Sequence, residues 1–268
     1  MTVTRPLFRY FGGKFAIAPW IIENMPPHRA YVEPFGGGGS VLLLKPKSYA
    51  EVYNDLDGDI CAVFRAIRDD FERLAHYLRH TPFSREEYDL SYQDTADPLE
   101  RVRRTLVRSW MGFGNSAQRA DGKTGFQAMV EKCGSSKSRQ WSIWLMALET
   151  FKARLAGVVI ENRDAIEVIE QQDSDQALFF LDPPYVPETR LSGSYKYEMT
   201  REQHETLCTK LLDVRGMVML CGYANSVYDR LGWHTITRVT QSMASTPRSE
   251  VIWLNPAAVA AQNQMGLF

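Results

Sequence analysis

The sequence predicts an α/β fold, in which helices cover both faces of an open, mostly parallel sheet and a helical segment is inserted into that sheet. Three observations support this prediction. Short apolar runs alternate with helix-like segments at both ends of the chain, as in parallel sheets. No strand pattern occurs between about residues 59 and 155. A chain of 268 residues is long enough for one large domain with such an insertion.

The first part of the catalytic domain is expected within residues 1–58. Its apolar patterns predict a helix at about 14–24, a strand at 30–33, a helix at 38–45 and a strand at 50–53. Strands and helices that alternate in this way are typical of parallel sheets.

The inserted segment, residues 59–155, is expected to be helical. Its predicted helices lie at about 58–79, 85–93, 98–110 and 138–155. Two of them begin at recognisable caps, because Asp97 precedes a proline and Ser84 with Glu87 fits a capping box. Residues 111–137 show little periodicity, and a loop of this length inside a compact domain is usually functional or disordered.

The second part of the catalytic domain is expected within residues 156–255. Five short runs there are typical of strands: "GVVIEN", "ALFFLD", "GMVMLCG", "WHTITRV" and "SEVIWLN". Helix-like segments separate the first three runs, and one of these segments begins with a capping box formed by Thr200 and Gln203. After Asn255 the residues become small and polar, which predicts a flexible tail over residues 256–268.

The charge of the chain is unevenly distributed. The net charge is −1, but 11 Lys or Arg against 4 Asp or Glu between residues 100 and 154 give this segment a local charge of +7. A localised basic segment favours a surface that faces nucleic-acid phosphates. On charge alone, a solvated helix face explains it equally well.

Composition excludes several classes of protein. No stretch is long and apolar enough for a membrane span or a signal peptide, and we expect a cytoplasmic protein of a bacterial or phage-infected bacterial cell. The four cysteines are scattered without the spacing of zinc or redox sites, so reduced thiols and no bound metal are expected.

A glycine-rich turn, "VEPFGGGGS" at residues 32–40, lies between a predicted strand and a predicted helix. A P-loop is excluded because Val41 follows Ser40, and the same valine replaces the third glycine of the dinucleotide fingerprint. Asp55, at the end of the next strand, can accept both ribose hydroxyls of a nucleoside cofactor. The pattern predicts a cofactor that contains adenosine, either NAD or S-adenosylmethionine, although a structural glycine turn also fits. Upstream, Lys14 in "RYFGGK" could hold a carboxylate such as that of a methionine moiety, or lie at the surface.

A second motif, "FFLDPPY" at residues 179–185, indicates the chemistry. Two prolines stiffen the turn after an apolar strand, so that the Asp182 carboxylate and the Pro183 carbonyl can point at one spot. Two acceptors suit an exocyclic amino group, which offers two N–H donors. If both hydrogens are held, the nitrogen lone pair can be aimed at a methyl group, and catalysis then depends on position and electrostatics. Tyr185 could stack on the base.

The ordered motifs "RYFGGK", "VEPFGGGGS", "NDLD", "ENRD", "LDPPY" and "TPRSEVIWLN" resemble the Dam-type (alpha-group) adenine-specific DNA methyltransferases. The resemblance covers most of the chain outside residues 59–155. It implies S-adenosylmethionine as the methyl donor and a Rossmann-like seven-stranded sheet whose last strand is reversed. It also implies that the mainly helical insertion is a target-recognition domain.

The resemblance also implies roles for single residues. Those expected to contact the cofactor are Tyr10, Lys14, Glu33, Phe35, Gly36, Gly38, Asp55, Asp164 and Asp182. Those expected to form the catalytic turn are Asp182, Pro183, Pro184 and Tyr185. In this assignment Asp55 holds the ribose and Asp164 lies near the cofactor adenine.

The expected substrate is double-stranded DNA with the target adenine flipped out of the helix. Candidate DNA contacts come from the basic insertion and from the loop after the catalytic turn, which could order over the flipped base. They are Arg101, Arg104, Asn115, Arg119, Lys123, Arg190 and Lys196.

Other functions are compatible with parts of the sequence. The same two acceptors could serve the 4-amino group of cytosine, and a relative that binds DNA without catalysis would keep the fold. The incomplete dinucleotide fingerprint and the "DPPY" turn disfavour an NAD-linked oxidoreductase. No proline precedes a cysteine, which disfavours carbon-5 methylation of cytosine.

The last five residues, Gln264–Phe268, resemble the Gln-x-x-Leu-Phe peptides that dock onto the bacterial sliding clamp. An extended peptide can bind by placing Leu and Phe in an apolar pocket. A terminus folded back on its own domain is the alternative.

Overall fold

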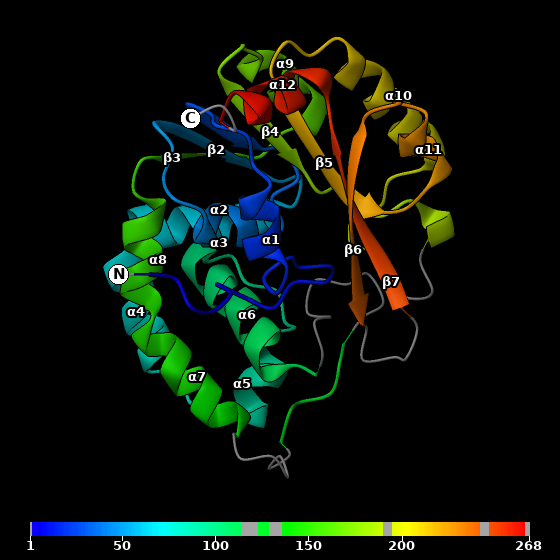
Figure 1. The fold of residues 1–268 in the computed structure, drawn as a ribbon. Helices are drawn as coiled ribbons and strands as arrows, with labels where there is room; N and C mark the ends of the chain where they lie inside the picture. Colours follow the sequence, from blue (N-terminus) through cyan, green and yellow to red (C-terminus); the bar gives the residue numbers. More distant parts are fainter. Residues whose placement is uncertain (1, 114–122, 129–135, 190–194, 242–246, 266–268) are drawn as a thin grey trace.

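The computed structural model describes residues 2–113, 123–128, 136–189, 195–241 and 247–265. Within these ranges the chain forms a seven-stranded sheet with helices on both faces (Figure 1). The strands are β1 (Ala30–Glu33), β2 (Ala50–Asn54), β3 (Val158–Glu161), β4 (Ala177–Leu181), β5 (Met217–Tyr223), β6 (His234–Gln241) and β7 (Pro247–Leu254).

The strand order is β3-β2-β1-β4-β5-β7-β6. Strands β1 to β5 pair in parallel, and β7 runs antiparallel to both β5 and β6. This confirms the predicted Rossmann-like sheet with a reversed last strand. The order changes direction between β1 and β4, and in open α/β sheets a ligand crevice forms at such a switch point, at the carboxyl ends of the strands.

Helices cover the two faces in separate groups (Figure 1). One face carries α1 (Ala18–Glu23), α2 (Ser40–Leu44), α3 (Gly58–Asp69) and α12 (Pro256–Met265), and the other carries α9 (Ala165–Gln172), α10 (Arg201–Leu212) and α11 (Ser226–Asp229). A short 3-10 turn, η1 (Pro187–Thr189), follows the catalytic motif. The strands are apolar on both sides because both faces are buried: in β4, Leu178 and Phe180 join one core while Phe179 and Leu181 join the other.

The inserted segment contains α4 (Phe71–Arg79), α5 (Arg85–Leu90), α6 (Pro98–Met111), α7 (Lys137–Met146) and α8 (Leu148–Leu155). The two long helices expected at 58–79 and 138–155 are each divided, at Asp70 and at Ala147. Asp97 caps α6 as predicted, since its carboxylate accepts from the amides of Leu99 and Glu100. The capping box of Thr200 and Gln203 is also present.

No break in the apolar core separates the insertion from the sheet among the described residues. Helix α3 contacts β3 and packs against α6 and α8, and side chains such as Phe64, Trp110 and Trp144 belong to the same cluster as Leu178 of β4. The boundary expected near residue 59 therefore falls within α3. We infer that the insertion is anchored to the sheet by shared packing.

The expectation of a flexible tail from residue 256 is wrong for the described residues 256–265, which form α12. Asn255 organises this helix: its side-chain oxygen accepts from the amides of Ala258 and Val218, and its side-chain nitrogen donates to the Gly216 carbonyl. Ala258 is fully buried. A cap residue followed by proline and alanines is a good helix start, which the small and polar composition concealed.

Candidate active site

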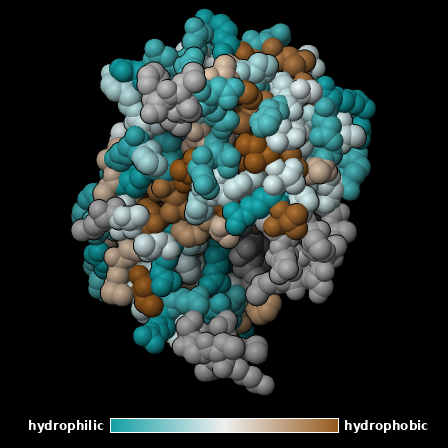
Figure 2. Space-filling model, in the orientation of Figure 1, coloured by the Kyte–Doolittle hydropathy of each residue, from teal (hydrophilic) through white to brown (hydrophobic). Residues whose placement is uncertain are grey.

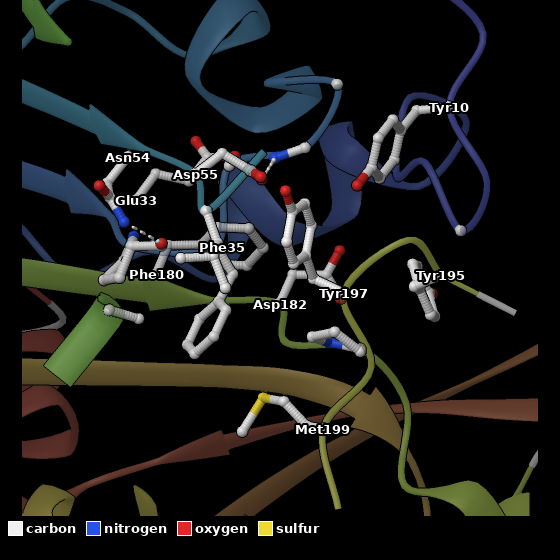
Figure 3. A pocket seen from close by; sticks show the side chains of 18 of the residues that line it. Tyr10, Glu33, Phe35, Asn54, Asp55, Phe180, Asp182, Tyr195, Tyr197 and Met199 are labelled. Carbon is white, nitrogen blue, oxygen red and sulfur yellow. Dashed lines mark hydrogen bonds between the residues drawn. The ribbon is translucent and has the colours of Figure 1, made fainter. Parts of the chain in front are cut away.

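A cavity of about 310 Å³ opens at the carboxyl ends of β1, β2 and β4, at the switch point of the sheet (Figure 3). Most residues predicted for the site line it: Tyr10, Lys14, Glu33, Phe35, Gly36, Gly38, Asp55, Asp164, Asp182 and Pro184. Pro183 and Tyr185 are not part of its wall. The loop before α10 adds Tyr195, Tyr197 and Met199.

The glycine turn is shaped by aromatic rings from within the protein. A side chain at Gly36 would lie 2.1 Å from the Tyr53 ring, and one at Gly37 would lie 2.7 Å from the Tyr10 ring. Gly39 has a φ of +59°, which favours glycine, and it faces Phe64. The Tyr53 hydroxyl donates to the Gly37 carbonyl at 2.6 Å. Tyr53 was not among the predicted site residues; its position directly before "NDLD" was the available signal.

Asp55 is held by backbone amides. One carboxylate oxygen accepts from the Gly37 amide and the other accepts from the Asp57 amide, each at 2.7 Å. Burial raises the pKa of this carboxyl to about 6, against the lowering effect of the two amides. Each oxygen keeps acceptor capacity, so the carboxylate is oriented to receive hydroxyl donors from a ligand in the cavity.

Asn54 ties the loops of the cavity together, and the sequence analysis missed it. Its side-chain nitrogen donates to the carbonyls of Pro34 and Arg163, and its side-chain oxygen accepts from the Arg163 amide. Its own carbonyl accepts from the Gly36 amide at 2.8 Å. One fully buried residue therefore connects the loops that follow β1, β2 and β3.

Two other residues predicted to bind the cofactor, Asp164 and Glu33, form hydrogen bonds with nearby residues of the protein. Asp164 caps α9, with its carboxylate accepting from the Ile166 amide at 2.8 Å. Glu33 is almost fully buried and accepts from the Tyr31 hydroxyl and the Leu42 amide. Burial raises the pKa of the Glu33 carboxyl to about 8.

Lys14 lies against the catalytic turn. Its ammonium group is 2.9 Å from an Asp182 oxygen, donates to the Tyr185 hydroxyl, and lies 3.8 Å from a Glu250 oxygen. Only 4% of Lys14 is exposed. Side chains of the protein already surround the ammonium group, so the alternative of a surface lysine is wrong, while a contact with a ligand carboxylate stays a prediction.

Asp182 stands at the end of β4, where the apolar strand enters the two prolines. Burial raises the pKa of its carboxyl to about 6, although Lys14 lowers it and Glu250 raises it further. Burial lowers the pKa of Lys14, but Asp182, Tyr185 and Glu250 outweigh this and raise it well above its ordinary value. The ionised Asp182 carboxylate beside Lys14 can thus act as a charged acceptor in a buried site.

Tyr185 is buried rather than presented to solvent. Its ring stacks on Tyr223 with centroids 4.3 Å apart, and 8% of the residue is exposed. Its hydroxyl donates to a Glu250 oxygen at 3.4 Å in addition to its contact with Lys14. One face of the ring is therefore supported from within the protein.

The loop after the catalytic turn lies over the cavity. The Tyr195 ring packs edge-on against Phe11 at 5.0 Å and contacts Gly12. Lys196, expected to contact DNA, instead bridges Asp57 at 2.9 Å and Asp59 at 3.1 Å. Both aspartates lie at the start of α3, so the bridge fastens this loop to the rim of the cavity.

The DNA contacts expected from the insertion differ in their environments. Arg104 is mostly buried, bonded to the Glu100 carboxylate of its own helix and to the Gln93 carbonyl in the segment between α5 and α6. Arg101 is 63% exposed and lies 3.3 Å from Asp59. Lys123 is half exposed beside Asp89. The remaining candidates, Asn115, Arg119 and Arg190, lie outside the described residues.

A short antiparallel pairing joins the end of α6 to residues 123–128. The Phe113 amide donates to the Gly125 carbonyl, and the Gln127 amide donates to the Met111 carbonyl. Phe113 is 66% exposed. Seen from the same side as Figure 1, the surface is hollowed near its middle, between the insertion and the β6–β7 end of the sheet (Figure 2).

Two features are absent from the described ranges. There, His, Cys, Asp and Glu side chains do not gather in groups of three that could hold a metal ion. None of the described helices has the length and apolar character needed to cross a bilayer.

The chain is similar to known proteins over most of its length. The family model of the D12 class N6 adenine-specific DNA methyltransferases matches residues 10–240. The chain is 26% identical to the Type II methyltransferase M1.LlaDCHI of Lactococcus lactis subsp. cremoris, over 83% of this chain and 82% of the relative. It is 24% identical to the Type II methyltransferase M.MjaIII of Methanocaldococcus jannaschii, over 83% and 85% respectively.

A third relative is the DNA N-6-adenine-methyltransferase of Escherichia phage P1, which is 25% identical over 78% of this chain and 28% of its own length. The family match covers the glycine turn, Asp55 and the catalytic turn. The protein thus belongs to the D12 class of N6 adenine-specific DNA methyltransferases.

Proposed function

We propose that the protein transfers a methyl group from S-adenosylmethionine to the 6-amino group of an adenine flipped out of double-stranded DNA. The observation that carries this proposal is the placement of Asp182, paired with Lys14, in the wall of the same cavity as Asp55 and the glycine turn. One cavity thus brings a site for a nucleoside next to a charged acceptor.

The cavity fits S-adenosylmethionine. Its volume of about 310 Å³ is typical of a small-ligand pocket. The Asp55 oxygens would accept from the two ribose hydroxyls, and the apolar side chains of Phe35 and Ile166, with Asp164 beside them, would hold the adenine. When bound, this cofactor supplies a methyl group on a positively charged sulfur.

The protein's own groups prepare the amino nitrogen. An Asp182 oxygen and the Pro183 carbonyl accept its two hydrogens, which localises the lone pair and aims it at the methyl carbon. In the transfer a nitrogen–carbon bond would form as the carbon–sulfur bond breaks, and the electron pair of that bond would stay on sulfur. The nitrogen carries the positive charge until it releases one proton to Asp182 or to water.

Tyr185 receives the flipped base on the ring face opposite Tyr223. The Tyr223 stack supports the ring from behind, so its orientation does not depend on the base. Stacking on an aromatic ring contributes roughly 1–3 kcal/mol per base in proteins that bind unpaired nucleotides. Because the loop with Tyr195 and Lys196 lies over this region, it moves aside when the base enters.

The hollow between the insertion and the β6–β7 end of the sheet is the proposed DNA path. Arg101 and Lys123 are the described candidates for phosphate contacts, and Asn115, Arg119 and Arg190 remain candidates from their residue types. Lys196 contributes only after it leaves Asp57 and Asp59. The cytoplasm, where such DNA is found, is the proposed location.

The test uses the purified protein, S-adenosylmethionine and unmethylated plasmid, with nucleosides analysed by mass spectrometry. N6-methyladenine formed by the wild type, and not by Asp182→Ala, is the expected result. Methylated cytosine at the 4-amino group would keep the mechanism and change the substrate. No methyl mark with any DNA, from a protein that binds the cofactor, would indicate a relative without catalysis.

The C-terminal peptide gives a proposed partner, the bacterial sliding clamp. Its first residues, Gln264 and Met265, form the last turn of α12, so extended binding requires this turn to unwind. Calorimetry with the full chain and with a variant lacking residues 264–268 tests the proposal. Binding that is equal in both forms, or missing from the full chain, would reject it.

A further inference from the structure

Glu250 approaches the catalytic turn from β7, the reversed strand. The β5–β7 register pairs Glu250 with Tyr223, the residue on which Tyr185 stacks. The Glu250 side chain lies within reach of the Tyr185 hydroxyl, at 3.4 Å, and 6% of the residue is exposed. The reversed strand thus places a second carboxylate beneath the motif that holds Asp182, and the family match ends before it, at residue 240.

The buried groups around Lys14 do not balance in charge. One ammonium group lies 2.9 Å from Asp182 and 3.8 Å from Glu250, so two carboxylates share it. The Glu250 oxygen nearer to Lys14 has no hydrogen-bond partner among the described residues. With Glu250 and Asp182 both ionised, the cluster carries one net negative charge.

Stability alone does not explain this arrangement. A buried carboxylate oxygen without a hydrogen bond costs free energy, and a distance of 3.8 Å recovers only part of that cost. The contrast with a structural pair in the same protein is clear. Glu51 is also buried, but Arg154 and Lys45 bond to it at 2.6–2.9 Å and satisfy its charge.

We propose that Glu250 is a positioning residue for methyl transfer, which shares Lys14 with Asp182 and so leaves a net negative charge beside the target amino group. This inference rests on the proposed function. During transfer, positive charge moves from sulfur to the amino nitrogen, and a fixed negative charge in a dry site stabilises that charge. Without Glu250, Lys14 would neutralise Asp182 and weaken it as an acceptor.

The inference predicts opposite effects of the two neighbours on the titration of Asp182. Glu250 is a like charge and raises the pKa of Asp182, whereas Lys14 lowers it. Several other titratable groups interact with Asp182 across the cavity floor and remain unchanged in the test. They are Tyr10, Glu33, Tyr185, Cys221 and Tyr228.

The experiment compares Glu250→Gln with the wild type in single-turnover methylation at saturating DNA and S-adenosylmethionine, from pH 5 to pH 8. Gln keeps an acceptor for the Tyr185 hydroxyl and removes only the charge. The rate at pH 8 is expected to fall by about tenfold to hundredfold. The acid limb of the profile is expected to move down by about one pH unit, and cofactor affinity is expected to stay within about twofold.

Three variants serve as controls. Glu149→Gln removes the same charge from an exposed position on α8 and should behave as the wild type. Glu250→Asp keeps the charge and should recover most of the rate. Lys14→Met removes the opposite charge and should move the acid limb upwards.

An unchanged rate and acid limb in Glu250→Gln, from a wild type that makes N6-methyladenine, would overturn the inference and leave the proposed function in place. If Glu250→Gln does not fold, Glu250→Asp and Lys14→Met decide. An inactive but folded Glu250→Asp together with an unmoved acid limb in Lys14→Met would also reject it. A wild type that makes no methyladenine would instead reject the proposed function.

Discussion

Two buried carboxylates line one cavity and differ in what holds them. Asp55 is bonded to two backbone amides, those of Gly37 and Asp57. Asp182 is paired with a buried ammonium group that it shares with Glu250. Burial raises the pKa of both carboxyls to about 6, so similar titration conceals different surroundings.

The difference indicates what each group is suited to do. Backbone amides fix the position of Asp55 and bring no mobile charge, which suits a site for neutral hydroxyls. Asp182 shares its ammonium partner with a second carboxylate, so its charge is only partly neutralised. This suits a position next to a group that gains charge during the reaction. The structural carboxylate Glu100 differs from both, because hydrogen bonds from Arg103 and Arg104 lower its pKa. Raised pKa values thus distinguish Asp55 and Asp182, and also Glu33 in the same cavity, from this structural carboxylate.

The largest expected effect is on the rate of methyl transfer, and it is expected for Asp182 and not for Asp55. Asp182→Asn removes the charge beside the amino group and replaces one acceptor by a group that can donate. We expect the single-turnover rate of methyl transfer to fall on the order of a thousandfold or more. The rate is measured with labelled S-adenosylmethionine and saturating DNA. A loss of less than about tenfold would mean that Asp182 is not the acceptor.

The next effect concerns Glu87 and Glu100, two carboxylates that stabilise the fold through Arg103. Arg103 is 7% exposed and bonds to both Glu87 and Glu100. Arg103→Ala leaves these two carboxylates without their arginine partner and is expected to lower the free energy of unfolding by about 3 kcal/mol. Urea denaturation measures this change. The exposed Arg101→Ala should change stability by no more than about 0.5 kcal/mol, and equal losses in the two variants would contradict the assignment.

Asp55 should affect binding more than chemistry. In Asp55→Asn the ribose hydroxyls lose a charged acceptor, which is expected to weaken S-adenosylmethionine by about tenfold to hundredfold. The rate at saturating cofactor should change much less. Initial rates over a range of cofactor concentrations separate the two quantities. A fall in the saturated rate with unchanged affinity would reverse the roles given to the two carboxylates.

The smallest effect concerns pH. Protonation of Asp182 removes its negative charge and turns one of its oxygens into a donor. Because its pKa is raised to about 6, activity is expected above about pH 6 and is lost as pH falls through that value. At saturating cofactor, kcat/KM for DNA should fall by about tenfold per pH unit below it. A flat profile down to pH 5 would show that Asp182 titrates lower.

Local sequence was sufficient for the elements of the sheet and for the kinds of residue in the site. Strands such as β4 were predictable because burial on both faces makes them continuously apolar. Asp55 and Asp182 were predictable because each follows a strand at the edge where ligands bind. The Dam-type resemblance, borne out by the family match, supplied the target.

The partners of these residues could not be predicted, because they depend on distant segments. Lys14 meets Asp182 across 168 positions and Glu250 across 236, and nothing near "RYFGGK" indicates either contact. Tyr53 of β2 explains the glycine at position 36 only once the turn after β1 lies against that strand. Arg104 was predicted to contact phosphate because it lies in a segment with many basic residues. The sequence does not show that Arg104 is instead paired with Glu100.

The most direct test of the division between the two carboxylates is calorimetric titration of S-adenosylmethionine into Asp55→Asn and Asp182→Asn, under one set of conditions. The expected result is that Asp182→Asn binds within about twofold of the wild type, while Asp55→Asn binds at least about tenfold more weakly. Equal weakening in both variants would contradict separate roles for the two carboxylates.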